Sequence, residues 1–298
     1  MFALNLASVT VALGLAASSV AQLPKPVLFS DGLSPHVDAT FMANIQPQNI
    51  TSLVSRTWGT LPEACLDYAH GAGLKGWDIE VYEVTYSDCD TPWVFCRHHE
   101  AQLSQFTMGQ LFGRLPVHER QWVRHVMAVP GGGSAYAVNA DVVFEGNTDA
   151  VSIFQHEVGH LVDAYNNGFS ANESPAFRAA VAADTCVPDD YSNSSFAEDY
   201  TQVSVLALYD IVAPGGLNST GANWSCLANQ KAAVDTLQRN AMTFGGKCDR
   251  RWSDSPSVEA QLRRGRRTAM PRGELDPPPY RSDRTFFKNI VHQFPAAN

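Results

Sequence analysis

The sequence lacks several features that would each have indicated a different class of protein. It has no internal repeat, no cysteine pair in a CxxC spacing and, beyond its first residues, no apolar run long enough to span a bilayer. Positive charge is scarce as well, with 21 Lys and Arg against 30 Asp and Glu. The missing CxxC argues against a zinc site built from thiolates.

The net charge of −9 is distributed unevenly along the chain. Residues 249–298 contain ten Lys and Arg and six Asp and Glu, a charge of +4, so the preceding residues carry −13. An acidic body repels the phosphates of nucleic acids and the anionic headgroups of membranes. We therefore expect that the protein binds neither nucleic acid nor membrane. Separately, we expect a monomer.

The N-terminus has the form of a secretory signal peptide. Residues 2–17 are mostly apolar, and Ser19-Val20-Ala21 before Gln22 has the small-x-small pattern of a cleavage site. The segment carries no Lys or Arg, and a membrane anchor is the alternative, but its Ser and Thr residues leave the apolar run short. We predict a signal peptide over residues 1–21 and a protein secreted to the extracellular space or cell wall.

Cysteines and sequons agree with secretion. Six cysteines in the mature part allow three disulfides in fifteen possible pairings. Proximity along the chain favours these pairs: Cys89–Cys96, Cys226–Cys248 and, as the remainder, Cys65–Cys186. Five Asn-x-Ser/Thr sequons indicate a glycosylated surface in a eukaryotic source: Asn49, Asn172, Asn193, Asn218 and Asn223.

Apolar periodicity predicts an α+β domain over residues 22–248 and a basic, Pro-containing, loosely ordered tail over 249–298. Strands are expected at 78–86, 123–129 and 135–144. Helices are expected at 101–112, 116–122, 151–165, 175–183, 195–209 and 227–242 and, in part, at 50–57. The segment 89–96 is expected to be a small loop.

The sequence His156-Glu157-Val158-Gly159-His160 lies in the predicted helix 151–165. Two histidines four residues apart share one helical face and can hold one Zn²⁺, and Glu157 between them can reach a water on the same metal. The turn at 146–149 precedes this helix, and Asp149 is the expected N-cap. The motif therefore follows a strand and a turn.

A catalytic zinc normally has a third protein ligand. In one class of zinc peptidases the third ligand is a histidine six residues after the second, but this chain has Asn166 at that position. In another class it is a glutamate from a later helix, and Glu198 lies 38 positions after His160 on a predicted helix. The alternative for Glu198 is a surface carboxylate that caps the first turn of that helix. An aspartate ligand also remains open, and the candidates are Asp199, Asp184, Asp189 and Asp190.

Two further side chains could orient the ligands. Gln202 is four residues after Glu198 and could hold its carboxylate, while Asp163 is one turn after His160 and could accept the second N–H of that imidazole. The alternative for Asp163 is a solvent-facing residue near the end of the helix.

The segment His156–Tyr165, followed by Phe196–Tyr200, resembles the catalytic core of gluzincin metallopeptidases of the anthrax lethal factor type. The resemblance implies a zincin-like domain with a mixed sheet, an HExxH helix and a later glutamate-bearing helix, in which a strand bordering the cleft can pair with substrate. It implies Zn²⁺ ligands at His156, His160 and Glu198. It also implies that Glu157 is the general base and that Tyr191 stabilises the oxyanion.

A wider resemblance covers roughly residues 57–216. It is carried by Gly113–Val117, Arg120–His125, the HExxH helix, Val187–Tyr191 and Pro214–Gly216, which are similar to the secreted fungal conidiation-specific family of peptidase-like proteins. The family is peptidase-like by motif, so the resemblance does not define a substrate.

Three hypotheses follow. The first is a secreted zinc metalloendopeptidase that acts on a peptide or protein substrate. The second is a secreted zinc-binding or zinc-scavenging protein without catalysis, because the secretion signal and paired histidines are also similar to secreted fungal zinc-binding antigens. The third is a structural glycoprotein with a chance HExxH. The general base Glu157 favours the first, since a protein that only binds zinc needs no base.

Overall fold

A computed structural model describes residues 23–260 and 292–293 of the chain, so the predicted signal peptide lies outside the described residues. Its centre is a seven-stranded mixed sheet in the order β11-β7-β8-β6-β5-β4-β2. The pairs β5–β6 and β6–β8 are parallel and the others antiparallel. The strands are β2 (Ile50–Ser55), β4 (Ile79–Tyr86), β5 (Cys89–His98), β6 (His125–Val129), β7 (Ser134–Val138), β8 (Asp141–Glu145) and β11 (His292–Gln293).

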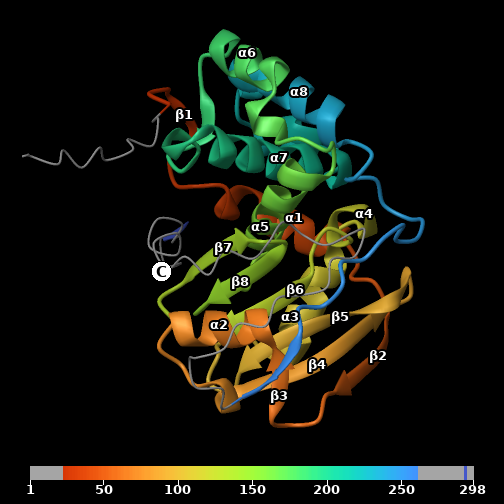
Figure 1. Ribbon diagram of the computed structural model, residues 1–298. Helices are drawn as coiled ribbons and strands as arrows, with labels where there is room; N and C mark the ends of the chain where they lie inside the picture. Colours follow the sequence, from red (N-terminus) through yellow and green to blue (C-terminus); the bar gives the residue numbers. More distant parts are fainter. Residues whose placement is uncertain (1–22, 261–291, 294–298) are drawn as a thin grey trace, which may run out of the picture.

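Helices cover both faces of this sheet (Figure 1). The upper part of the molecule contains α1 (Ser34–Asn44), α5 (Val151–Tyr165), α6 (Pro175–Ala183), α7 (Phe196–Val212) and α8 (Ala228–Gln238), with α3 (Gln105–Arg114) and α4 (Val117–Arg120) on the same side. The opposite face carries α2 (Glu63–Gly71). Two small sheets pair β1 (Val27–Phe29) with β9 (Val187–Asp189) and β3 (Thr60–Pro62) with β10 (Ser257–Glu259). Short 3-10 turns complete the chain at Gly76–Asp78, Ala171–Glu173, Ser192–Ser194, Gly216–Thr220 and Trp224–Leu227.

The α+β class with a mixed sheet is confirmed. Strand β4 shows why helices pack on both faces of the sheet. Successive side chains of a strand point to opposite faces. Tyr82, Val84 and Tyr86 therefore pack into the large core beneath the helices, while Ile79 and Val81 pack with α2. No helix of the described residues is long and apolar enough to cross a bilayer.

The predicted strand 135–144 is wrong in one respect, because it is a hairpin of two strands. Asn139 and Ala140 have φ values of 50° and 68°, in the left-handed region that a tight turn requires. The chain reverses there, so β7 and β8 pair antiparallel, with Val138 opposite Asp141. The alternation of apolar residues continues through the turn and hides it in the sequence.

Two other segments were predicted wrongly. Residues 50–57 were expected to be partly helical, but 50–55 form the edge strand β2, and residues 89–96, expected to be a loop, belong to the long strand β5. Both pair with β4: β2 comes from more than twenty residues earlier in the chain, and β5 follows β4 through a tight turn that sets Tyr86 opposite Cys89. The helices predicted at 151–165 and 175–183 are confirmed at those bounds.

All three predicted disulfide pairs are wrong, although the number of disulfides is three. The bonds join Cys65 to Cys96, Cys89 to Cys248 and Cys186 to Cys226. Both residues of the favoured first pair lie on β5, where seven residues of extended chain span about 23 Å. A strand cannot fold back to join two of its own residues at that separation, so each cysteine bonds to another element.

The packed structure continues beyond the predicted domain boundary at residue 248. Arg251 is half-buried and donates to the backbone oxygens of Val123 and Pro92, and Trp252 donates through Nε1 to the Trp122 oxygen at 2.7 Å. Strand β10 then pairs with β3. Residues 249–260 are thus part of the domain, while 261–291 and 294–298 of the predicted tail lie outside the described residues.

A buried carboxyl supports the motif-bearing helix from below. Glu119 on α4 accepts hydrogen bonds through Oε1 from Gln155 on α5 at 3.0 Å and from Gln238 on α8 at 2.8 Å. Burial raises the pKa of Glu119 to about 7, although the two amides act in the opposite direction. This carboxyl therefore joins three helices and prefers its neutral form.

Disulfide mapping tests the topology. Digestion under non-reducing conditions followed by mass spectrometry is expected to give three linked peptide pairs that correspond to the bonds above. A peptide that links Cys89 to Cys96 would contradict the strand assignment of β5, because that bond cannot form in an extended segment.

Stability against pH tests the buried carboxyl. Between the ordinary pKa of 4.5 and the raised pKa of about 7, the unfolded chain loses its proton before the folded chain does, so stability falls as pH rises through this window. Glu119→Gln keeps the accepting oxygen and removes the ionisation. We expect the variant to gain up to about 3 kcal/mol over the parent at pH 8, and much less at pH 4, in urea unfolding. An equal difference at both pH values would contradict the raised pKa.

Candidate metal centre

The helix α5 carries the two histidines and is held at its start by another helix. Its N-cap residue is Ala150, so the predicted cap Asp149 is wrong. Instead, Asp38 on α1 accepts hydrogen bonds from Ser152 N and Ser152 Oγ, both at 2.8 Å. A carboxylate at a helix N-terminus satisfies free N–H groups and offsets the helix dipole. The cap was missed because it lies more than a hundred residues away.

The helix α7 brings the third candidate ligand to the same place. Ser195 is its N-cap and accepts from Glu198 N at 3.1 Å, which starts the helix three residues before the glutamate. Glu198 is only 8% exposed, and its carboxylate lies beside the two histidines. The alternative in which Glu198 is a surface carboxylate is therefore wrong.

Gly159 lets α5 and α7 approach closely. A Cβ at this position would lie 2.9 Å from Ser204 Oγ and 3.5 Å from Thr201 Cγ2, both on α7. Because the glycine is one of the two variable positions of HExxH, the motif itself provides the contact surface for the helix that carries Glu198. Sequence reasoning did not use this residue, although a glycine inside a strongly apolar helix is a signal of close packing.

Three ligand atoms form a nearly equilateral triangle. His156 Nε2 lies 3.1 Å from His160 Nε2 and 3.0 Å from Glu198 Oε2, and His160 Nε2 lies 3.2 Å from the same oxygen. Tetrahedral Zn²⁺ with ligand bonds near 2.05 Å requires donor atoms about 3.3 Å apart. Among the described residues, this set is the one group of His, Cys, Asp or Glu whose donor atoms could hold an ion together. The donor set therefore fits Zn²⁺ in chemistry and in size.

A hydrogen-bonded chain orients His156. Its Nδ1 lies 3.1 Å from Gln202 Oε1, and Gln202 Nε2 donates to Asp189 Oδ2 at 2.6 Å. Since Gln202 uses its oxygen as acceptor here, Nδ1 carries the proton and Nε2 is left with the lone pair that a metal needs. The prediction that Gln202 holds the Glu198 carboxylate is corrected: it contacts the histidine.

Asp163 is not the solvent-facing residue of the alternative, since it is 4% exposed. Its carboxylate accepts from Asn172 N at 2.7 Å and from Asn172 Nδ2 at 2.5 Å. Burial opposes a charged His160, but the adjacent Glu198, together with Glu157 and Asp163, raises the pKa of His160 to about 9. The three carboxyl groups around this imidazole therefore favour a positive charge at the site, and a metal ion would supply one.

Glu157 is fully buried next to the triangle. Burial raises its pKa to about 7, despite the opposing effect of His156 and His160. Neither carboxylate oxygen accepts a hydrogen bond from any described residue. An unsatisfied buried carboxyl is costly and is rare outside functional sites. Its burial and its lack of a hydrogen-bond donor make Glu157 a candidate functional residue.

Of the remaining predicted site residues, the structure places Tyr191 beside the centre and the four aspartates outside the ligand triangle. The ring of Tyr191 lies 5.5 Å from the ring of His156, centroid to centroid, so this tyrosine borders the centre.

The four alternative aspartates do not belong to the ligand triangle. Asp184 accepts from Asn229 and Gln230, and Asp189 from Ser192 and Gln202. Asp190 is exposed, and Asp199 is buried with a pKa raised to about 8, first by burial and then by Asp189.

Comparisons with known proteins give a family and no activity. The family model for conidiation-specific protein Con-13 matches residues 31–261, which include the whole candidate centre. Conidiation-specific protein 13 from Neurospora crassa is 35% identical over 210 residues, which is 67% of this chain and 61% of that protein. The chain therefore matches less than two thirds of the length of this relative. No solved structure matches.

Substitution of Gly159 tests the helix contact. Gly159→Val places side-chain carbons where Ser204 and Thr201 lie, so α7 must move and carry Glu198 away from the histidines. We expect at least a tenfold loss of zinc affinity, measured by competition with a chromogenic chelator, and a smaller loss for Gly159→Ala. Ala164→Val on the same helix is the control for adding a branched residue. Equal zinc affinity in Gly159→Val and the parent would show that the contact does not position the ligand.

Proposed function

The chain belongs to the conidiation-specific protein Con-13 family, and we propose that it is a secreted zinc-dependent metalloendopeptidase with His156, His160 and Glu198 as metal ligands. The observation that carries the proposal is the combination of a metal-sized ligand triangle with a buried, unsatisfied Glu157 next to it. A site that serves only to hold zinc has no use for that carboxyl. The fold would then be of the zincin type.

The residues divide the chemistry between them. Bound Zn²⁺ would act as a Lewis acid for a scissile carbonyl and for water. Glu157 accepts a proton from the attacking water and transfers it to the leaving amine. Tyr191, beside His156, donates a hydrogen bond from its hydroxyl to the developing oxyanion. The hydrogen bonds from His156 to Gln202 and from Gln202 to Asp189 keep the imidazole in place while negative charge develops on the substrate oxygen.

The sheet offers a place for an extended peptide. Strand β7 contacts α5 and, apart from a pairing of two residues with β11, forms one edge of the sheet. His292 and Gln293 of β11 pair antiparallel with Ala135 and Ser134, so this edge can accept an added strand. Main-chain pairing of this kind binds peptides with little dependence on their sequence. The arrangement supports a peptide as the substrate.

Secretion is part of the proposal. Three disulfides among the described residues are compatible with an oxidising compartment. Three of the five sequons, Asn49, Asn218 and Asn223, are exposed and open to a glycan. The side chain of Asn172, in contrast, is bonded to Asp163, and that of Asn193 to the backbone of Lys25.

A second candidate, zinc binding without turnover, is favoured by one observation. The side chains of His156, His160 and Glu198 are 1%, 16% and 11% exposed, so the centre opens to solvent only on the His160 and Glu198 side. A limited opening admits water and ions more readily than a folded protein. The two candidates differ in whether Glu157 has a measurable role.

Replacement of the proposed base tests turnover. Glu157→Gln removes the proton acceptor but no metal ligand, so we expect one zinc per chain, as in the parent, and a fall of at least a hundredfold in cleavage of a fluorogenic peptide library. Glu173→Gln, an exposed carboxyl after the same helix, is the matched control and should cleave like the parent. Equal cleavage by Glu157→Gln would refute the base. Zinc in both proteins with no cleavage in the parent would support the second candidate.

A further inference from the structure

A second hollow lies away from the metal centre, against the sheet edge formed by β2 and β4. Its volume is about 200 Å³, and its walls come from residues 55–61, the turn Gly76–Trp77, strand β4, Gln105 and Ala260. None of these residues belongs to α5 or α7, which carry the ligands. Figure 1 places this part of the sheet at the lower end of the molecule, away from α6, α7 and α8.

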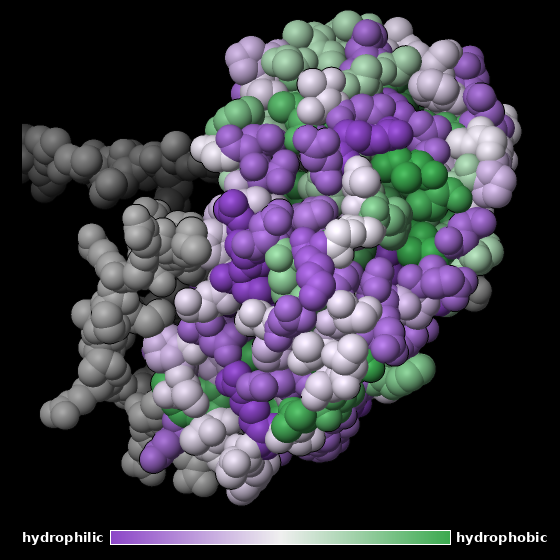
Figure 2. Space-filling model, turned by 90° about the vertical axis from the view of Figure 1, so that its right-hand side faces the viewer, coloured by the Kyte–Doolittle hydropathy of each residue, from purple (hydrophilic) through white to green (hydrophobic). Residues whose placement is uncertain are grey.

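Two tryptophans border this hollow and face solvent. Trp58 is 73% exposed and Trp77 is 40% exposed, the largest side chains among the exposed apolar residues of the described chain. Exposed indoles are unusual on a surface that is otherwise polar, as the face in Figure 2 illustrates, where hydrophobic residues form separate patches. Large exposed aromatic side chains that share one hollow indicate a binding surface.

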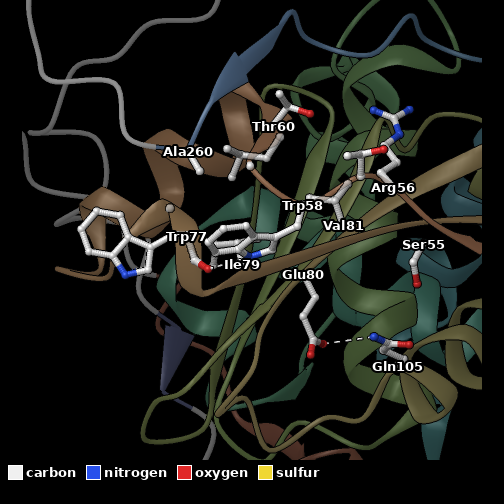
Figure 3. A pocket seen from close by; sticks show the side chains of 14 residues that line it. Ser55, Arg56, Trp58, Thr60, Trp77, Ile79, Glu80, Val81, Gln105 and Ala260 are labelled. Atoms are coloured by element: carbon white, nitrogen blue, oxygen red, sulfur yellow. Dashed lines mark hydrogen bonds between the residues drawn. The ribbon is translucent and has the colours of Figure 1, made fainter.

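The two indoles are held in place by the backbone. Trp58 Nε1 donates to the Trp77 oxygen at 3.2 Å, which joins the two turns, as Figure 3 shows. Gly59 follows Trp58 with a φ of 104°, a conformation that other residues rarely adopt. Gly76 precedes Trp77, and a Cβ there would lie 2.6 Å from the Ala260 oxygen. Both turns depend on glycine, so the surface is formed before a ligand arrives.

Polar groups in the same hollow are uncharged or already neutralised. Glu80 accepts through Oε2 from Arg97 at 3.1 Å and from Gln105 at 3.1 Å. Figure 3 shows the hydrogen bond between Gln105 and Glu80, with Glu80 close to Trp58. Arg56 is paired with Glu83 at 2.8 Å and Asp254 at 2.7 Å. Hydroxyls of Ser55, Thr57 and Thr60 complete the lining. The lining side chains thus offer hydrogen-bond donors and acceptors, and the charged ones among them are paired. At the border, Lys75 Nζ lies 5.3 Å from the centroid of the Trp77 ring.

We propose that this hollow binds a neutral oligosaccharide. A pyranose with equatorial hydroxyls presents an apolar face of C–H groups, which matches an exposed indole, and a rim of hydroxyls, which matches carboxylate, amide and hydroxyl partners. The two charged side chains of the lining, Arg56 and Glu80, are already paired, which disfavours an ionic ligand. A hollow of this volume accommodates about one sugar ring, and the neighbouring indole can carry the next.

Binding of defined sugars tests the proposal. The probes are cellohexaose, laminarihexaose and the hexamer of N-acetylglucosamine, titrated calorimetrically into the full secreted chain. We expect at least one of them to bind with a dissociation constant below 1 mM, in the range that small interfaces reach. Trp58→Ala and Trp77→Ala should each weaken that binding at least tenfold. Phe169→Ala, which removes an exposed aromatic ring outside the hollow, is the control and should bind like the parent.

Three results would overturn the proposal. These are the absence of binding by all three sugars at 5 mM, equal affinity in the parent and the tryptophan variants, or saturable binding of an uncharged hexapeptide that both variants abolish. Thermal unfolding of each variant confirms folding, which the exposure of Trp58 should preserve. Glu157→Gln should bind the sugar like the parent, so failure here and failure of the proposed peptidase activity are independent.

Discussion

The contact between α5 and α7 at Gly159 is the constraint on which the rest of the centre depends. Two histidines four residues apart can be placed by one helix alone, but a third ligand must come from another element. The absence of a side chain at Gly159 allows α7 to lie against α5, and the capping of α7 by Ser195 sets where Glu198 falls along it. Asp38 holds the other end of α5. Helix packing, not loop conformation, therefore sets the ligand geometry.

That packing concentrates carboxyl groups in the interior. Glu157, Asp163, Asp189, Glu198 and Asp199 are all buried. Asp163, Asp189 and Glu198 are met by amide, hydroxyl or imidazole groups, while the oxygens of Glu157 and Asp199 accept no hydrogen bond from the described residues. Burial is the largest cause of the raised pKa of Glu157 and Asp199, and it is a cost to the folded state. A divalent cation held by two imidazoles and one carboxylate would offset that cost. A bound metal would therefore stabilise the core as well as supply the proposed chemistry.

Local patterns in the sequence predicted what depends on a single element. Helix 151–165 and the ligand candidates on it follow from apolar spacing and from HExxH, and the structure places His156, His160 and Glu198 together. What depends on distant partners was missed. Cys89 bonds to Cys248, and Gln202 turns to His156 because Asp189 holds its amide. Composition and spacing along the chain carry no information on such partners.

The central claim is that His156, His160 and Glu198 together hold one Zn²⁺. Zinc X-ray absorption spectroscopy on the purified secreted chain tests it most directly. We expect one zinc per chain, bound by two imidazole nitrogens and by oxygen at about 2.0–2.2 Å, with no sulfur ligand. Substitution of Glu198 by Ala should remove one oxygen ligand and leave both imidazoles. A chain without zinc, or a spectrum with sulfur or a single imidazole, would contradict the account.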